Sequence, residues 1–218
     1  GDTSLKAVVI QGESVTVGNN AFGGIEFPII YSSSEIQIPA NSATQIVVAV
    51  TNGGIFASVP TNNTSLAAPI KNGSVFAGWY SDADFSGESI NAIEQVKGSK
   101  FSTYYAKWTE SHYQEPGELN LGEMVVGELS SQSFEINLKE GVEGTPLVTS
   151  VTCSDSSVFT VGQTGNRVIV TPVTTLPAGD YSEVLTVTTG DGATFFVNVT
   201  LKVTPAPEPE EPEEPTDP

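Results

Sequence analysis

The sequence holds very few residues of the kinds that carry out chemistry. Cys153 is the only cysteine and His112 the only histidine among 218 residues. A single thiol cannot form an internal disulfide or supply the cysteine ligands of a zinc site. Hydrolase triads need a base beside the nucleophile, almost always histidine, and His112 lies in the polar segment 110–117, where we expect an exposed connector. The sequence therefore predicts no enzyme and no cofactor.

Basic residues and long apolar runs are also scarce. Eight Lys and Arg residues stand against 26 Asp and Glu residues, which gives a formal net charge of −18. Such a chain repels a nucleic-acid backbone, and an anionic membrane surface for the same reason. No stretch approaches the roughly 20 apolar residues needed to cross a bilayer. We expect neither nucleic-acid binding nor direct membrane insertion.

Strand signals dominate what the sequence does contain. In 194–203 the alternate residues are apolar: Phe195, Val197, Val199, Leu201 and Val203. This period of two predicts a half-buried strand, and the turn Gly190-Asp191-Gly192 pairs it with 181–189 in a hairpin. Further strands are predicted at 133–138, 147–153 and 168–173. Short strands with turns between them predict an Ig-like antiparallel β-sandwich over 116–204.

The N-terminal half is less regular but also indicates strands. They are predicted at 6–10, 14–17, 26–31, 35–38, 45–50 and 101–108. In the last of these, Tyr104, Ala106 and Trp108 share one face, while 89–96 is the one segment whose pattern allows a short helix. At the other end, 205–218 contains six prolines, six acidic residues and no basic residue. Such a composition predicts an extended, solvated linker.

Two aromatic motifs lie between these regions. They are Phe76-Ala77-Gly78-Trp79-Tyr80 and Tyr104-Tyr105-Ala106-Lys107-Trp108, preceded by the turn Asn52-Gly53-Gly54, Pro69 and the turn Asn72-Gly73, with Asp82 after the first motif. On these residues 45–109 resembles the Listeria–Bacteroides repeat, the internalin B-repeat type of module. Tyr104 departs from the family, which usually has an aliphatic residue there. The resemblance implies a small β-grasp-like fold, an exported bacterial protein and a repeat or stalk role.

Together these readings divide the chain into four parts and make it all-β. A small β-grasp-like repeat module (45–110) precedes the Ig-like sandwich (116–204) and the acidic linker (205–218). Residues 1–44 form an N-terminal β segment, either the remainder of a preceding module or strands that complete the repeat.

Three small groups of residues are candidates for a site. Asp82, Asp84 and Ser86 place oxygen atoms at alternate positions with Gly87 sixth, as at the start of a calcium loop. The acid expected at the twelfth position is missing, because Ile93 stands there, so a structural turn is favoured over a calcium site. Cys153 shares a predicted strand face with Leu147 and Val151, which favours a buried thiol acting as a small hydrophobe.

The aromatic residues form the third candidate. Trp79, Tyr80, Tyr105 and Trp108 are the rings of an exposed platform on which sugars could stack. A module of this size has few other large apolar residues, which favours a core role for the same rings. The two readings make different predictions about exposure.

The sequence as a whole predicts a non-catalytic fragment of a modular, extracellular cell-surface protein. It would act as a structural or adhesive stalk that presents or contacts a protein or glycan partner. The alternative is a carbohydrate-binding module appended to a glycan-degrading enzyme.

Overall fold

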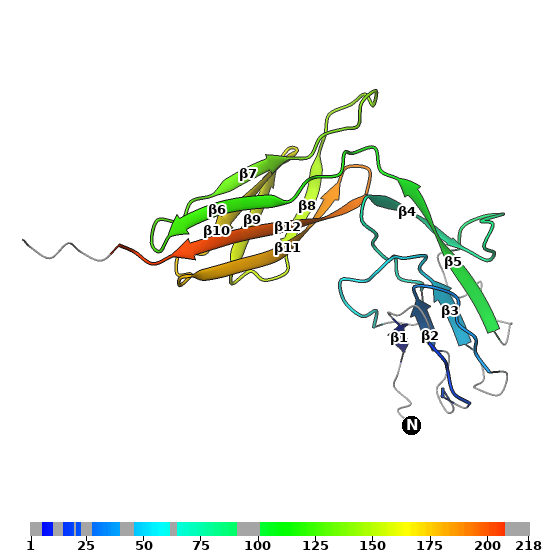
Figure 1. The fold of residues 1–218 in the computed structure, drawn as a ribbon. Coiled ribbons are helices and arrows are strands. Elements are labelled where there is room, and N and C mark those ends of the chain that lie inside the picture. The colour runs from blue at the N-terminus through cyan, green and yellow to red at the C-terminus, as the bar shows by residue number, and fades with distance from the viewer. Residues whose placement is uncertain are drawn as a thin grey trace, which may run out of the picture. The chain divides into compact units, whose positions relative to one another are not determined.

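The structure is a computed structural model, and it describes residues 6–10, 15–19, 21–22, 28–39, 46–61, 65–90 and 101–207. These residues form twelve strands and no helix, so the protein is all-β, as predicted (Figure 1). The chain divides into two compact units. Unit one is Gly1–His112 with Asp191–Phe195, and unit two is Tyr113–Gly190 with Phe196–Pro218.

Unit one is built on a single five-stranded sheet of mostly parallel strands. Its strands are β1 (Ala7–Ile10), β2 (Ile29–Ser32), β3 (Ile46–Val50), β4 (Ser74–Tyr80) and β5 (Phe101–Glu110), in the order β1-β2-β3-β5-β4. The first four in this order pair in parallel, and β4 pairs antiparallel to β5. Ala7 pairs with Ile29 and Ile29 with Val47, so each winding takes roughly 20 residues, as in a solenoid. Segments on both sides of residue 44 therefore build one sheet.

Both faces of this sheet are covered. Every residue of β2 and of β3 is buried. One face carries the cluster Ala7, Ile29, Tyr31, Val47, Ala49, Leu66, Trp79, Tyr104 and Ala106. The other carries Val17, Phe22, Ile30, Ile46, Val48 and Val50. Parallel strands covered on both sides have continuous apolar sequences, and this explains the run Ile46–Val50.

Two predicted strands of unit one are wrong in the residues that are described. Residues 35–38 and 15–17 are irregular segments. Val17, Ile36 and Ile38 nevertheless pack on the sheet face that carries Ile30. The apolar residues of these two segments alternate with polar ones because one side of each irregular segment packs on the sheet and the other does not. The predicted helix at 89–96 and the linker at 205–218 lie mostly outside the described residues. Ile90, which is described, forms an isolated β-bridge with Trp79, and its N–H donates to the Trp79 carbonyl at 2.7 Å.

Unit two is a sandwich of two sheets. Its strands are β6 (Leu119–Val125), β7 (Gln132–Glu135), β8 (Val148–Cys153), β9 (Phe159–Thr164), β10 (Arg167–Pro172), β11 (Gly179–Thr189) and β12 (Thr194–Thr204). One sheet has the order β7-β10-β9 and the other β6-β12-β11-β8 (Figure 1). Taken in chain order, this is the seven-strand arrangement of an immunoglobulin-type sandwich, with the first strand placed beside the last. The pairing of β6 with β12 is parallel, so the sandwich is not wholly antiparallel.

The core of unit two follows the predicted alternation. The five apolar residues of β12 that were predicted to share a face are each at most 3% exposed, and all of them except Phe195 belong to unit two. The predicted hairpin is confirmed, since β11 and β12 are neighbours joined at Gly190-Asp191-Gly192. One face assignment is wrong: Leu147 is 46% exposed, and Val148, which is 3% exposed, takes the core position at the start of β8. The strands β6 and β9 were not predicted, because neither has an unbroken alternation.

Candidate functional site

The Asp82 carboxylate accepts hydrogen bonds from residues of its own loop. Oδ1 accepts the backbone N–H groups of Asp84 at 3.0 Å and Ser86 at 3.1 Å, and Oδ2 accepts the Ser86 hydroxyl at 2.6 Å. The hydrogen bonds from Ser86 are the main cause that lowers the pKa of Asp82. Phe85 takes a left-handed backbone conformation with φ of 56° inside this loop.

This geometry organises a turn. A calcium ion needs six to eight oxygen ligands, and here one carboxylate already accepts three hydrogen bonds from its own loop. Within the described ranges, no group of three or more His, Cys, Asp or Glu side chains is placed to hold a metal ion. The loop therefore supports the turn reading of Asp82, Asp84 and Ser86.

The four candidate platform rings are divided between the two faces of the unit-one sheet. Trp79 is 1% exposed, packs in the cluster with Tyr31, and donates its Nε1–H to the Ala67 carbonyl at 3.1 Å. Trp108 packs partly against the same cluster and donates its Nε1–H to the Thr51 carbonyl at 2.9 Å. Both tryptophans therefore use their ring and their N–H group to hold the unit together.

The two tyrosines lie on the opposite face. Tyr80 and Tyr105 are paired across β4 and β5, and Tyr105 packs partly against the cluster that contains Ile30. The Tyr105 hydroxyl donates to Glu35 at 2.6 Å, and this bond to a carboxylate is the main cause that raises the pKa of Tyr105. Lys107 Nζ lies 5.0 Å from the centroid of the Tyr80 ring, a cation–π distance. The structure thus brings the four rings together in pairs and forms no single platform.

The two single residues have structural surroundings. His112 is exposed, as predicted, and its backbone N–H donates to Asp191 at 2.8 Å. Cys153 was expected to be buried, and the structure shows it partly buried. Its thiol lies 3.4 Å from the Asp155 carbonyl, and desolvation is the main cause that raises its pKa. A raised pKa reduces the thiolate fraction and so the reactivity of the thiol.

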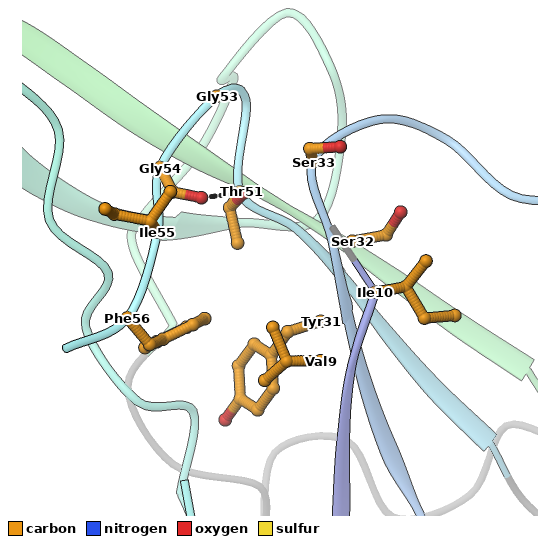
Figure 2. Close-up of a pocket in the computed structure, with 10 residues that line it drawn as sticks. All are labelled: Val9, Ile10, Tyr31, Ser32, Ser33, Thr51, Gly53, Gly54, Ile55 and Phe56. Atoms are coloured by element: carbon orange, nitrogen blue, oxygen red, sulfur yellow. Dashed lines mark hydrogen bonds between the residues drawn. The ribbon is translucent and has the colours of Figure 1, made fainter. Parts of the chain in front are cut away.

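Unit one has a hollow of about 220 Å³ where β1, β2 and β3 end (Figure 2). The side chains of Val9, Tyr31 and Phe56 gather at it, and Ile55 also belongs to its lining. Thr51 also lines it, but its hydroxyl donates to the Gly54 carbonyl at 2.7 Å. No charged residue belongs to this lining.

The hollow at the strand ends is a gap in the apolar packing of unit one. Ser32 is its one residue with a buried hydroxyl that lacks a hydrogen-bond partner among the described residues. Figure 2 shows this side chain turned away from Tyr31 and Phe56. The volume also lies below the roughly 300–1,000 Å³ of ordinary ligand sites. The hollow is therefore small, and few of its polar groups are placed to orient a ligand.

A second and larger hollow lies in unit two. It measures about 510 Å³, is shallow, and is lined mostly by residues with polar or charged side chains, and we call it the polar hollow. Its lining comes from β6, β11 and β12 and consists of Asn120, Gly122, Glu123, Asp180, Tyr181, Ser182, Thr200, Leu201 and Lys202. Sequence reasoning missed it because β6 was not predicted and its residues are far from β11 and β12 in the chain. The Asn-Leu-Gly sequence at 120–122, which interrupts the strand pattern, was the one available signal.

No protein-family model matches this chain, and no curated protein is significantly similar to it. The part of the chain that the structure describes contains no long apolar helix of the kind that crosses a membrane.

Proposed function

We propose that this chain is a non-catalytic part of a modular bacterial cell-surface protein, which serves as a structural or adhesive stalk. The observation that carries the proposal is the seven-strand order of unit two, β7-β10-β9 against β6-β12-β11-β8, which is that of immunoglobulin-type modules. Many cell-surface proteins are built from such sandwiches. The corner before β11 supports the same reading, since the Tyr181 hydroxyl donates to the Pro177 carbonyl at 2.8 Å, like the tyrosine corner of these modules.

The resemblance of 45–109 to the Listeria–Bacteroides repeat adds to this proposal. The residues that carry the resemblance have core roles in unit one, as in a structural module: Trp79 and Trp108 pack on one sheet face and bond to backbone carbonyls. Two residues with reactive side chains, Asp82 and Cys153, likewise form hydrogen bonds within their own loops, to Ser86 and to the Asp155 carbonyl. We propose on this basis that the chain extends from the cell surface and contacts a protein or glycan partner outside the cell.

Surface labelling tests the location. An antibody raised against the purified chain should label intact cells of the source bacterium, and mild protease treatment of those cells should remove the label. Cells that are labelled only after permeabilisation would contradict the proposal. A cytosolic marker labelled in parallel controls for lysis.

The second candidate function is a carbohydrate-binding module appended to a glycan-degrading enzyme. The polar hollow of unit two is the observation that favours it. The parent gene distinguishes the two, because this candidate requires a catalytic glycosidase domain in the same protein.

A further inference from the structure

The strand β1 (Ala7–Ile10) lies at one edge of the unit-one sheet (Figure 1). Among the residues that the structure describes, its one neighbouring strand is β2, with which it pairs in parallel. Every residue of β2 is buried, whereas in β1 Ala7 alone is buried and the other three residues are partly exposed. One side of β1 is therefore open to a further strand.

The hydrogen bonds of β1 show which backbone groups face this open side. In a parallel sheet, the N–H and C=O groups of successive residues point alternately to the two sides of the strand. The Ile29 N–H donates to the Lys6 carbonyl at 3.2 Å, so the backbone groups of Lys6 and of Val8 point toward β2. Those of Ala7 and Val9 point to the open side. Each of these two residues thus offers one donor and one acceptor to a strand that adds there.

The strand β1 lacks the features that usually protect an edge. Natural edge strands carry charges, prolines or bulges, or are very short. The residues of β1 are Ala-Val-Val-Ile, its pairing with β2 shows no register shift, and it is as long as the internal strand β2. Lys6 precedes the strand, and its backbone groups point toward β2. A strand that ends a solenoid needs a polar outer side, so β1 has the composition of an internal strand.

The hollow of unit one lies where β1 ends. Val9 and Ile10 line it together with Tyr31 and Phe56 (Figure 2). Ile55, in the same lining, is 42% exposed. A strand that ran beside β1 and ended level with it would bring its last side chains to this apolar surface. Removal of apolar surface from water is favourable, so the added strand should be apolar as well.

The order of the windings identifies the segment that belongs beside β1. Ala7 pairs with Ile29, which is 22 positions later, and Ile29 pairs with Val47, which is 18 positions later. The strands β1, β2 and β3 follow one another across the sheet in chain order and all run in parallel. The same order places next to β1 a strand that lies about 18–22 positions before Ala7 in the parent polypeptide.

Charge argues against a second copy of the chain as the occupant. The net charge is −18, so two copies repel each other, and a charge of this size favours the monomer. A strand of the same polypeptide avoids this repulsion between two whole chains. Its covalent connection also keeps it at a high effective concentration near β1.

We propose that the open edge of β1 pairs with one further parallel strand, a short apolar segment from a winding that precedes β1 in the parent polypeptide. The backbone groups of Ala7 and Val9 form the hydrogen bonds to it, and its side chains extend the two apolar faces of the sheet. Unit one is then the last part of a longer solenoid. This inference goes beyond the proposed function and does not depend on where the protein is located.

The parent gene provides the first test. Its translation should show a run of about four apolar residues, rich in Val and Ile, about 18–22 positions before Ala7. A charged residue or a proline within that run, or the absence of the run, would overturn the proposal.

Amide hydrogen exchange tests the pairing itself. The protein is prepared in two lengths, as the chain of 218 residues and as the same chain with the preceding residues of the parent polypeptide, about 30 of them. In the longer protein the Ala7 and Val9 amides should exchange at least roughly tenfold more slowly than in the shorter one. The Val8 amide, which already faces β2, should change less.

Two variants of the longer protein separate pairing from packing. Val9→Pro removes the N–H that faces the added strand, whereas Val9→Ala shortens the side chain and keeps the N–H. Val9→Pro should return the exchange rate of the Ala7 amide to that of the shorter protein, and Val9→Ala should keep most of the protection. The Ile29 amide, which donates to Lys6, should stay protected in both variants and so report that β1 still pairs with β2.

Equal exchange rates at Ala7 and Val9 in the two lengths would overturn the proposal. Slow exchange at both amides in the shorter protein would do the same, because its own residues would then cover the edge. If the shorter protein sediments as a dimer and its Ala7 exchange slows with concentration, the occupant is a second copy and the proposal is wrong. Negative surface labelling would reject the proposed function and leave the exchange result at β1 as it is, so the two failures are distinguishable.

Discussion

The two units bury their strands in different ways. In β2 and β3 of unit one, the residues that point to either face of the sheet are all buried, because the sheet is parallel and covered on both faces. In β12 of unit two, buried and more exposed residues alternate, because one face of the sheet meets the core and the other meets solvent. A polar residue is therefore tolerated at every second position of β12, whereas β2 and β3 offer no exposed position for one.

The largest expected effect comes from adjacent residues in β2 and β12. Ile29 and Ile30 are each fully buried, so Ile29→Ala and Ile30→Ala should each lower the free energy of unfolding of unit one by about 2–5 kcal/mol. Leu201→Ala should cost unit two about the same. Lys202→Ala should cost only about 0–1 kcal/mol, since its ion pair is exposed.

Chemical denaturation measures these four variants. Both tryptophans of the chain lie in unit one, so their fluorescence follows that unit, and amide NMR signals of β12 follow unit two. Near-neutral behaviour of either isoleucine variant would contradict the two-faced burial of the parallel sheet. A large loss for Lys202→Ala would contradict the one-faced burial of β12.

This difference also decides what the sequence can reveal. The alternation in 194–203 predicts one buried face of β12 correctly, and the turn at 190–192 predicts its hairpin. The run Ile46–Val50 also predicts a strand but gives no face and no neighbour. Its parallel pairing with Ile29–Ser32 depends on a winding of roughly 20 residues, which an internal-repeat search of Ala7–Ile10, Ile29–Ser32 and Ile46–Val50 could have found.

The candidate site was less predictable than the fold. The hollow of unit two depends on Gly122, where a bulge shifts the register of β6 against β12. The Asn-Leu-Gly sequence at 120–122 marks an interruption of the strand, but the shift itself depends on pairing between residues about 80 positions apart. The aromatic motifs, in contrast, were visible in the sequence, but exposure decides their role, and Trp79 is 1% exposed.

Gly54→Ala should produce the next largest effect. An ideal Cβ at Gly54 would lie 2.6 Å from Trp108 Cζ2 and 3.0 Å from Pro69 Cβ, too close without movement of a packed ring. Forced repacking of this kind costs about 1–3 kcal/mol. Gly18→Ala, also in unit one, meets no heavy atom within 4 Å and is the matched control.

Thermal unfolding followed by tryptophan fluorescence measures the Gly54→Ala effect. Because the clash would fall on Trp108, the emission spectrum of the folded variant should change as well. Equal stability of the Gly54→Ala and Gly18→Ala variants would show that the turn at Gly54 is not held against Trp108.

Asp191→Asn should weaken unit one by a smaller amount. Oδ2 accepts the Ser111 hydroxyl at 2.9 Å and the His112 N–H at 2.8 Å, and Oδ1 accepts the Ala193 N–H at 3.1 Å. The amide keeps one acceptor oxygen but turns a donor toward one of these partners, at a cost of about 1–2 kcal/mol. Slower amide exchange at 112 in the variant than in the parent would contradict this account, and Glu128→Gln is the control.

The smallest effect concerns two similar loops, one in each unit. It tests whether a loop behaves in the same way although the sheets of the two units differ. Asp82 in unit one and Asp155 in unit two each accept a backbone N–H from a serine that follows, Ser86 at 3.1 Å and Ser157 at 2.7 Å. These serines lower the pKa of both carboxyls. A lowered folded pKa means that the stabilisation is present above the unfolded value of about 3.9 and is lost as the pH falls through the folded one.

Amide NMR titration of Ser86 and Ser157 from neutral to acid pH should therefore show a midpoint below about 3.9 at both positions. Asp82→Asn should abolish the transition at Ser86 and leave that at Ser157 unchanged. Because each bond is made within one loop, the pairing of the neighbouring sheet should not matter. A midpoint at or above the unfolded value in one unit alone would show that the sheet beneath the loop does control it.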